Sequence, residues 1–385
     1  MKDVVIPMIK EQEMCSFAIY RLPGDTHCTL MAQPDEPLEL SSATELNGKS
    51  GFVLAPFAVS AECPILLLQP VTLSSFSIDD IPSALNEERL MPGASQEVGN
   101  EERPTEREHY AIDFANFHAR LTEGRFQKLV LARSKFIAAT PKRPLELFCQ
   151  ACRLYPNAFV AWVKTPRSGD WLMATPEVLL QGEGEAWHTM ALAGTMEAPI
   201  VLKRHSGDDG SPTTALHWSI KNIQEQRYVA TYIMQNLERF ASQIQEEGPV
   251  TVQAANVVHL RSDFHFTLDH TNQIGTLLQA LHPTPAVCGL PKGEAQDFIV
   301  RNEASRRRYY SGFSGPLQLE GATHLFVSLR CMQLGVDGYR LYAGGGLLTD
   351  SEEEMEWNET EAKMQAMMQL ITPPSPSNED ALTTE

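Results

Sequence analysis

The sequence predicts an α+β fold, in which long helices pack against strands that pair as hairpins. Within residues 1–75, short apolar segments such as Ser16–Arg21 and Gly51–Ala55 alternate with turn residues, a pattern typical of strands. The segment Ala215–Glu247 instead carries apolar residues at helical spacing. The chain has 385 residues, of which 43% are hydrophobic and 21% are charged, so it holds enough apolar surface to offset the entropy lost on folding.

The other elements are expected from the same two patterns, taken in chain order. Residues 84–109 are polar and charged, so we interpret them as a linker or an exposed loop. Helices are expected at His109–Glu123, Pro144–Tyr155, Ala215–Glu247, Thr271–Leu281, Gly293–Arg307 and Glu352–Met367. Strands are expected at Gln127–Ile137, Ala158–Lys164, Trp171–Ala174, Trp187–Ala193, Val250–Phe266, His324–Leu334 and Tyr339–Gly346. Loops are expected at Gly207–Pro212 and Ser311–Gly315.

The net charge excludes several classes of partner. Lys and Arg number 31 and Asp and Glu number 49, which gives a formal net charge of −18. Nucleic acids and anionic membranes normally require a basic face, so neither is expected as a partner. Apolar stretches such as Pro64–Leu68 are far shorter than the roughly 20 residues that a membrane helix needs. The N-terminus lacks a signal-peptide pattern, and we therefore expect a cytoplasmic protein.

Seven cysteines are scattered along the chain, an odd number that fits reduced thiols. Cys149 and Cys152 form a C-x-x-C motif within the predicted helix Pro144–Tyr155. Redox or metal chemistry is one interpretation of such a pair, but no second Cys or His pair lies nearby to complete a zinc site. We therefore interpret the two thiols as packing residues of the helix.

The predicted C-terminal helix carries a candidate site. Glu356, Glu359 and Lys363 occupy positions i, i+3 and i+7, so two carboxylates and an ammonium group share one face of the helix. The glycine run Gly344–Gly346 precedes that helix, and glycine lets backbone N–H groups approach an anion closely. The plainer interpretation is a solvated helix with an i, i+4 Glu–Lys pair after a glycine turn.

Three further charged residues are candidates. Glu225 lies on a predicted helix, and two helices that each supply a glutamate can hold Mg²⁺, which prefers a few carboxylates and keeps several waters. Lys128 lies within a predicted strand, where a lysine that faces a cavity can serve as a base. Glu177 lies at a turn that follows Pro176. Taken singly, each of the three is more simply explained as an exposed charge.

A set of segments occurs along the chain in this order: Lys128–Arg133, Ala174–Leu180, Leu192–Thr195, His282–Gly289, Arg308–Gly315, Ser328–Arg330, Ala343–Leu348 and Glu356–Lys363. Their sequences and their order, over about residues 108–370, resemble the chorismate-utilising enzymes. This family includes isochorismate synthase, salicylate synthase, anthranilate synthase and aminodeoxychorismate synthase. The resemblance implies large, mostly antiparallel sheets packed with helices, as in anthranilate synthase component I. It also implies three parts: a strand-rich part without a motif at 1–105, a catalytic region at 106–371, and a disordered tail at 372–385.

Two positions distinguish the chemistries of this family. Lys128 stands where members that use water have lysine and those that use ammonia have glutamine. Ala193 stands where aminodeoxychorismate synthases have a lysine that attacks the ring. The resemblance therefore implies an isochorismate synthase, an isomerase of menaquinone or siderophore biosynthesis. Such an enzyme adds water at C2 of chorismate as the C4 hydroxyl leaves. The alternatives are a salicylate synthase, which goes on to eliminate pyruvate, and a non-catalytic relative that binds a metabolite.

The resemblance also implies roles for single residues. Lys128 is expected to be the general base that takes a proton from water. Glu177 is expected to be the general acid that protonates the leaving hydroxyl, and it therefore needs a raised pKa. Mg²⁺ is expected between Glu225 and Glu359, with Glu356 in or near its ligand shell, where it binds the ring carboxylate of the substrate.

The substrate carboxylates are expected to bind Arg330, a residue type that contacts a carboxylate through two nitrogens, with assistance from Tyr310. The rest of the anion site is expected to comprise Gly194, Thr195, Gly344 and Lys363. His259 matches a family histidine near the ring, and both a direct catalytic role and a purely structural one remain open. Ile220 and Asn222 stand where the family often has acids, which predicts weaker binding of Mg²⁺. We expect a monomer without an amidotransferase subunit.

Overall fold

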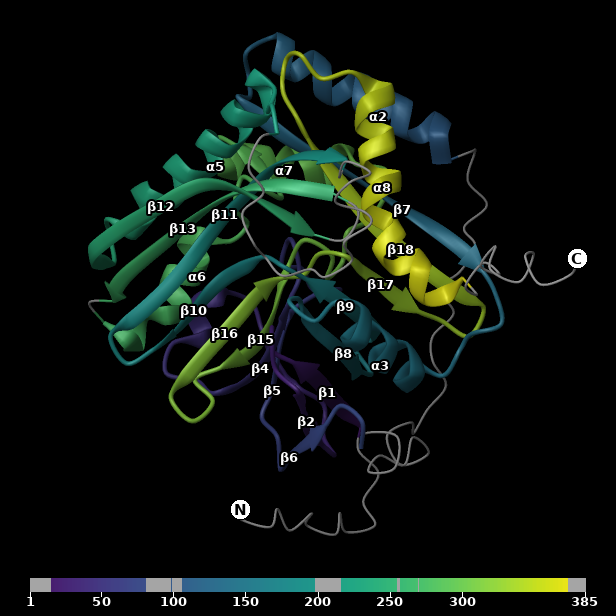
Figure 1. Ribbon diagram of the computed structural model, residues 1–385, viewed down its shortest axis with the longest axis vertical. Coiled ribbons are helices and arrows are strands. Elements are labelled where there is room, and N and C mark those ends of the chain that lie inside the picture. The colour runs from purple at the N-terminus through teal and green to yellow at the C-terminus, as the bar shows by residue number, and fades with distance from the viewer. Residues whose placement is uncertain are drawn as a thin grey trace, which may run out of the picture.

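The computed structural model describes residues 15–80, 98, 106–197, 216–254, 257–268 and 270–372 (Figure 1). Over these residues the chain forms two nine-stranded sheets, in which all paired strands are antiparallel, and six α-helices. The predicted α+β fold of antiparallel sheets and helices is confirmed. The predicted linker at 84–109, the loop at Gly207–Pro212 and the tail at 372–385 lie wholly or mostly outside the described residues.

The first sheet contains β1 Ser16–Arg21, β2 His27–Gln33, β6 Thr72–Ser77, β7 Lys128–Ala138, β8 Phe159–Thr165, β9 Gly169–Thr175, β14 Gly289–Leu290, β17 Cys331–Leu334 and β18 Gly338–Leu347. Its strand order is β14-β7-β18-β17-β9-β8-β1-β2-β6. Strand β1 pairs with β8, so the N-terminal strands add to one end of a sheet whose other strands come from later in the chain.

The second sheet contains β3 Leu38–Leu40, β4 Gly51–Ala55, β5 Ile65–Leu68, β10 Val178–Glu183, β11 Ala186–Glu197, β12 Ala241–Ala254, β13 Val257–Leu268, β15 Phe313–Leu317 and β16 Ala322–Val327. Its strand order is β12-β13-β11-β10-β16-β15-β4-β5-β3. Here β4 pairs with β15, so N-terminal strands enter both sheets.

The helices are α2 Glu106–Thr122, α3 Pro144–Leu154, α5 Ile220–Leu237, α6 Ile274–Leu281, α7 Lys292–Asn302 and α8 Glu353–Ile371. Proline at the first position of α3 needs no hydrogen-bond partner for its nitrogen, which favours a helix start there. The side chain of Ser219 caps α5 by accepting a hydrogen bond from the backbone of Asn222. None of the helices in the described ranges is long and apolar enough to span a membrane.

The two sheets pack face to face, with helices on their outer faces (Figure 1). Phe159 of the first sheet stacks on Phe326 of the second, with ring centroids 4.3 Å apart. Helices α3 and α8 cover the first sheet, and α5 and α6 cover the second. Cys149 and Cys152 lie on the buried face of α3 and belong to the hydrophobic core that this helix forms with the first sheet, as predicted for packing residues.

Two crossings between the sheets lie side by side. Between β9 and β10 the chain passes from the first sheet to the second, and Glu177 lies on this crossing. Between β16 and β17 it passes back, and Arg330 lies there in the left-handed region, with φ of 45°. The amide of Val327 donates to the carbonyl of Glu177 at 2.9 Å, and the amide of Ala174 donates to the carbonyl of Arg330 at 3.0 Å. The two side chains are therefore held near each other between the sheets.

Most predicted elements are confirmed, with ends shifted by a few residues. The predicted helix Ala215–Glu247 is wrong in its second half, because β12 begins at Ala241 and pairs with β13. The predicted strand Val250–Phe266 is wrong as one element, because its first residues belong to β12 and its last to β13. The predicted strand His324–Leu334 is wrong as one element, because β16 and β17 belong to different sheets. The predicted loop Ser311–Gly315 ends in strand β15, which pairs with β4. In each case pairing with a distant strand overrides the local pattern.

Candidate active site

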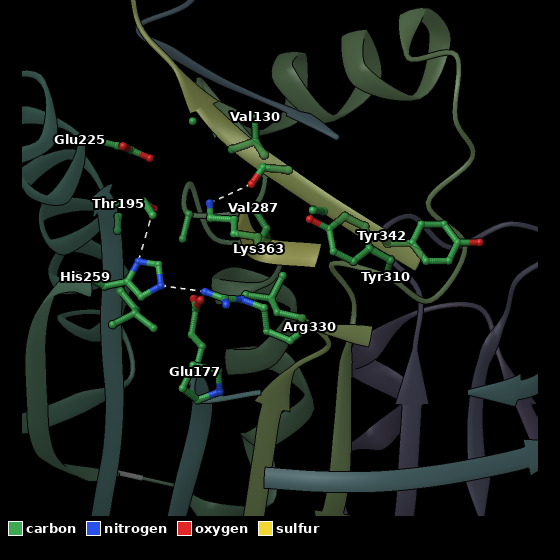
Figure 2. Close-up of a pocket in the computed structure, with 18 residues that line it drawn as sticks. Val130, Glu177, Thr195, Glu225, His259, Val287, Tyr310, Arg330, Tyr342 and Lys363 are labelled. Carbon is green, nitrogen blue, oxygen red and sulfur yellow. Dashed lines mark hydrogen bonds between the residues drawn. The ribbon is translucent and has the colours of Figure 1, made fainter. Parts of the chain in front are cut away.

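A cavity between the two sheets gathers many of the predicted site residues (Figure 2). Its lining includes Glu177, Thr195, Glu225, His259, Tyr310, Arg330, Gly344 and Lys363. Figure 2 shows Arg330 and Glu177 pointing toward the same region, while the stacked rings of Tyr310 and Tyr342 lie at another side. Ala193 also belongs to the cavity lining, so this position supplies no amino group.

The other predicted residues lie directly around this cavity. Lys128 is fully buried, and its Cε lies 3.1 Å from the point that a Cβ on Gly346 would occupy. Glu356 and Glu359 lie behind Gly345, where an added Cβ would be 2.9 Å and 3.5 Å from their nearest oxygens. Gly345 and Gly346 have no side chains, so only their backbone atoms lie next to these three side chains.

Gly194 shapes the opposite wall of the cavity. Its φ of 69° lies in the left-handed region, and a Cβ there would meet the carbonyl oxygen of Asn222 at 2.9 Å. Glycine is therefore required for α5 to pack this closely on β11. Its carbonyl oxygen faces His259, which gives Gly194 a direct hydrogen bond within the site.

Three ion pairs join the glutamates behind the glycine run to lysines. We call Glu225, Glu356 and Glu359 the glutamate cluster. Lys128 contacts Glu225 at 2.9 Å, and Lys363 contacts Glu359 at 2.6 Å. The third pair joins Glu356 to Lys221, at the start of α5. Each carboxylate of the cluster therefore has an ammonium group as its neighbour.

The members of the glutamate cluster differ in their electrostatic environment. Burial alone would raise the pKa of Glu225, but the ammonium group of Lys128 lowers it below its ordinary value. Burial and the neighbouring charge of Glu359 raise the pKa of Glu356 to about 7, against the opposing effect of Lys221. Burial alone would lower the pKa of Lys221, but Glu356 raises it above its ordinary value.

Glu177 is the carboxyl group of the cavity that stays protonated at neutral pH. Burial raises its pKa to about 8, although Lys128, Lys363 and Arg330 each act to lower it. Burial thus outweighs three nearby cations. A carboxylic acid with this pKa, on the surface of a cavity, is suited to give a proton to a leaving group.

His259 holds the guanidinium group of Arg330. Burial, together with the charges of Arg330 and Lys363, keeps the pKa of His259 well below its ordinary value, so the ring is neutral. A neutral ring has one donor nitrogen. Nδ1 donates to the carbonyl of Gly194 at 3.3 Å, and Nε2 accepts from Nη2 of Arg330 at 2.9 Å. Of the two roles left open by the sequence, this geometry favours positioning of Arg330 from within the site.

The glutamate cluster fits a divalent cation in its donor chemistry. The Oε2 atom of Glu356 is buried and has no hydrogen-bond partner among the described residues. The missing side chains of Gly345 and Gly346 leave space in front of the carboxylates, since a Cβ on Gly346 would lie 2.0 Å from Oε1 of Glu225. Within the described ranges, no three His, Cys, Asp or Glu side chains already converge on one point as metal ligands do. Carboxylate oxygens are nevertheless the ligands that Mg²⁺ prefers.

The sequence did not predict the contacts that three residues of α5 make around the site. Lys221 pairs with Glu356, and Asn222 donates to the carbonyl of Thr195 at 3.3 Å. Gln226 is fully buried and accepts from the amide of Ala193 at 2.9 Å. Helical spacing offered a signal for Lys221, because it lies one turn before Glu225 on the same face. A neutral amide at position 222 can donate this hydrogen bond, which a carboxylate cannot.

The substitution Gly346→Ala is expected to disrupt this site with little effect elsewhere. The new Cβ would lie 2.0 Å from Glu225 and 3.1 Å from Lys128, so the ion pair must move. We expect at least a tenfold loss of activity on chorismate, with about 1–3 kcal/mol lost from the free energy of unfolding. Gly293→Ala is the matched control, because nothing lies within 4 Å of its added Cβ. Equal activity of the two variants in a steady-state assay would contradict the placement of Glu225.

The chain is similar in sequence to known proteins. The family model for "chorismate binding enzyme" matches residues 75–372. The chain is 30% identical over 255 residues to isochorismate synthase MenF of Escherichia coli (strain K12), which covers 65% of this chain and 57% of that protein. It is 33% identical over 270 residues to the salicylate biosynthesis isochorismate synthase of Pseudomonas aeruginosa, covering 69% of this chain and 55% of that protein. The matched part thus spans little more than half the length of these relatives.

Solved structures share the fold over nearly the whole chain. The structure of MenF from Escherichia coli matches with a TM-score of 0.73 and 23% identity, covering 94% of this chain and 90% of that one. Anthranilate synthase component I from Streptococcus pneumoniae matches with a TM-score of 0.64 and 16% identity, covering 95% and 94%. The fold resemblance to anthranilate synthase component I is confirmed. With the family model matched over most of its length, the chain belongs to the family of chorismate binding enzymes.

Proposed function

We propose that this protein is an isochorismate synthase, an isomerase that converts chorismate to isochorismate. The observation that carries the proposal is that Glu177 lines the cavity, while Lys128, which lies outside that lining, pairs with the lining residue Glu225 at 2.9 Å. A lysine at position 128 favours water over ammonia as the nucleophile, and Ala193 offers no amine to attack the ring. The names of the similar proteins from Escherichia coli and Pseudomonas aeruginosa support the same activity.

The cavity suits a substrate with two carboxylates despite the net charge of −18. Arg330, held by His259, presents its guanidinium group to bind one carboxylate. Lys363 lines the cavity and is anchored by donation to the carbonyl of Gly344 at 2.9 Å. We assign Tyr310, Thr195, Gly194 and Gly344 to the remainder of the anion site. These local cations oppose the overall negative field where the substrate binds.

The proposed reaction moves two protons. Lys128 accepts a proton from the water whose oxygen bonds to C2, and the ring double bonds shift as the bond from C4 to its hydroxyl breaks. Glu177 donates its proton to that departing hydroxyl, which leaves as water. In the free protein the ammonium group of Lys128 is paired with Glu225, so Lys128 must first lose a proton to solvent before it can accept one from the attacking water. One water is added and one is lost, and the product is an isomer of the substrate.

Mg²⁺ is the cofactor that we propose, with Glu225 and Glu359 as ligands and Glu356 in or near the ligand shell. Bound there, it would act as a Lewis acid that offsets the charge of the ring carboxylate. Helix α5 supplies Glu225, which lies beside Gly346, and helix α8 supplies Glu356 and Glu359, which lie beside Gly345. Their side chains are largely buried, so a cation held there would be shielded from bulk water.

Incubation with chorismate and Mg²⁺, followed by separation of the products, tests the proposed function. Isochorismate as the product is expected. Salicylate with pyruvate would identify the alternative, a salicylate synthase. Anthranilate formed with ammonia would contradict attack by water, and chorismate binding without turnover would identify a non-catalytic relative.

Removal of the divalent cation is expected to abolish activity. Without it, the ring carboxylate would face the buried glutamates with no compensating charge beyond the lysines already paired to them. Isochorismate formation should fall at least a hundredfold in EDTA and return when Mg²⁺ is added in excess. Activity that persists in EDTA after extensive dialysis would contradict the assigned cofactor.

The biological setting follows from the same proposal. We place the enzyme in menaquinone or siderophore biosynthesis, in the cytoplasm, acting as a monomer without an amidotransferase subunit. We also propose that residues 106–371 form the catalytic region, with residues 1–105 as its strand-rich N-terminal part. Sedimentation of the pure protein tests the oligomeric state.

A further inference from the structure

The three carboxylates of the glutamate cluster are matched by three ammonium groups of neighbouring lysines. Lys128, Lys221 and Lys363 each pair with one member of the cluster. When all six groups are ionised, their charges cancel without any further cation. A divalent cation can therefore bind only by displacing ammonium groups from the carboxylates, since two cations side by side in a buried site repel each other strongly.

Lys221 differs from the other two lysines in its surroundings. Lys128 is fully buried within strand β7, and Lys363 both lines the cavity and donates to the carbonyl of Gly344. Lys221 is not part of the cavity lining, and its side chain is 20% exposed. Among the described residues, Glu356 is its one hydrogen-bond or ion-pair partner. Lys221 can therefore release Glu356 and turn its ammonium group to water, where hydration offsets part of the lost ion pair.

Glu356 is placed to exchange this ammonium group for a cation. The Glu356 side chain is only 2% exposed, and Oε1 accepts from Lys221. Its other oxygen, Oε2, is buried without a partner in the described part of the chain and faces the open side of Gly345. A buried carboxylate oxygen without a donor is costly, and a bound cation would satisfy it.

We infer that Lys221 competes with a divalent cation for Glu356 and so sets the affinity with which the protein holds that cation. The inference rests on the proposed Mg²⁺ site and adds a residue that touches neither substrate nor cavity. Lys221 acts as a positioning residue: it keeps Glu356 in place when no cation is bound and withdraws when one binds. Removing its charge should leave the cluster with a surplus carboxylate and strengthen cation binding.

The test is calorimetric titration of the full-length protein with Mg²⁺ alone, without substrate. We expect Lys221→Gln to bind Mg²⁺ about tenfold more tightly than the wild type, because one competing charge near the cation is gone. Lys221→Arg keeps the charge and should bind like the wild type. Arg227→Gln is the matched control on the same helix, since Arg227 is 54% exposed and pairs with Glu246 at 3.0 Å, outside the cluster.

A second readout guards against a folding defect. Circular dichroism should give the same spectrum for all variants, and Mg²⁺ should raise the melting temperature of Lys221→Gln more than that of the wild type. Equal or weaker Mg²⁺ binding by Lys221→Gln, or no binding by either protein, overturns the inference. Turnover of chorismate is measured separately. Unchanged Mg²⁺ affinity with active enzyme would reject only the role of Lys221, whereas tighter binding without turnover would reject only the proposed reaction.

Discussion

Lys128→Gln is expected to reduce isochorismate formation by about 10²–10⁴-fold, the usual contribution of a general base. Glutamine can hydrogen-bond to water but cannot take its proton at neutral pH. Position 128 is fully buried, so the variant has no titratable side chain at this point of the site. Steady-state rates measured by product separation, with chorismate and Mg²⁺ in excess, check this expectation.

Loss of the base must be distinguished from loss of the ion pair with Glu225. Titration of the Lys128→Gln variant with Mg²⁺ does so: retained binding with lost turnover identifies a proton-transfer role. Lys135→Gln is the matched control, because Lys135 lies on the same strand β7 but pairs with Glu361 at 3.1 Å and is 31% exposed. An undiminished rate for Lys128→Gln would show that Lys128 is not the base.

Glu177→Gln is expected to lower turnover by a similar factor of about 10²–10⁴ while leaving binding of the substrate largely intact. The amide is similar in shape to the protonated acid but has no proton to give to the leaving hydroxyl. Glu183→Gln, at the exposed end of strand β10, should be silent. Turnover of Glu177→Gln at the wild-type rate would exclude Glu177 as the acid.

The pH profile gives an independent measure of the same group. Glu177 must be protonated to act, and its pKa is raised to about 8 by burial. The wild-type kcat/KM should therefore fall as the pH rises through about 8. The residual activity of Glu177→Gln should lack this fall. A wild-type profile that is flat between pH 7 and 9 would contradict the assignment.

The residues proposed for the site could be chosen from the sequence because each lies in a short contiguous motif. Lys128 begins a strand, and Glu356, Glu359 and Lys363 share a helix face through spacing alone. The packing role of Cys149 and Cys152 followed equally from helical spacing and the absence of a second ligand pair. Local periodicity also placed most helices and strands to within a few residues.

The local sequence pattern could not predict which distant strand each segment pairs with. Residues 241–247 have a composition compatible with a helix, and only pairing with β13 makes them a strand. The segment His324–Leu334 reads as one strand, yet it changes sheets at Arg330. In both segments the secondary structure depends on hydrogen bonds to other strands. Such pairing produces no characteristic spacing of apolar residues within the segment itself.

The sequence by itself indicated which charged residues are candidates for acid–base chemistry. Its short apolar stretches argued against a membrane-spanning helix, and no helix within the described ranges is long and apolar enough to be one. Only the tertiary structure decided the pKa values and the contacts of these residues. It buried Glu177 on a crossing between sheets, which raises its pKa, and it turned His259 toward Arg330. It also paired Lys221 with Glu356 across two helices. The physical reason is that desolvation and ion pairing depend on groups brought together from distant parts of the chain.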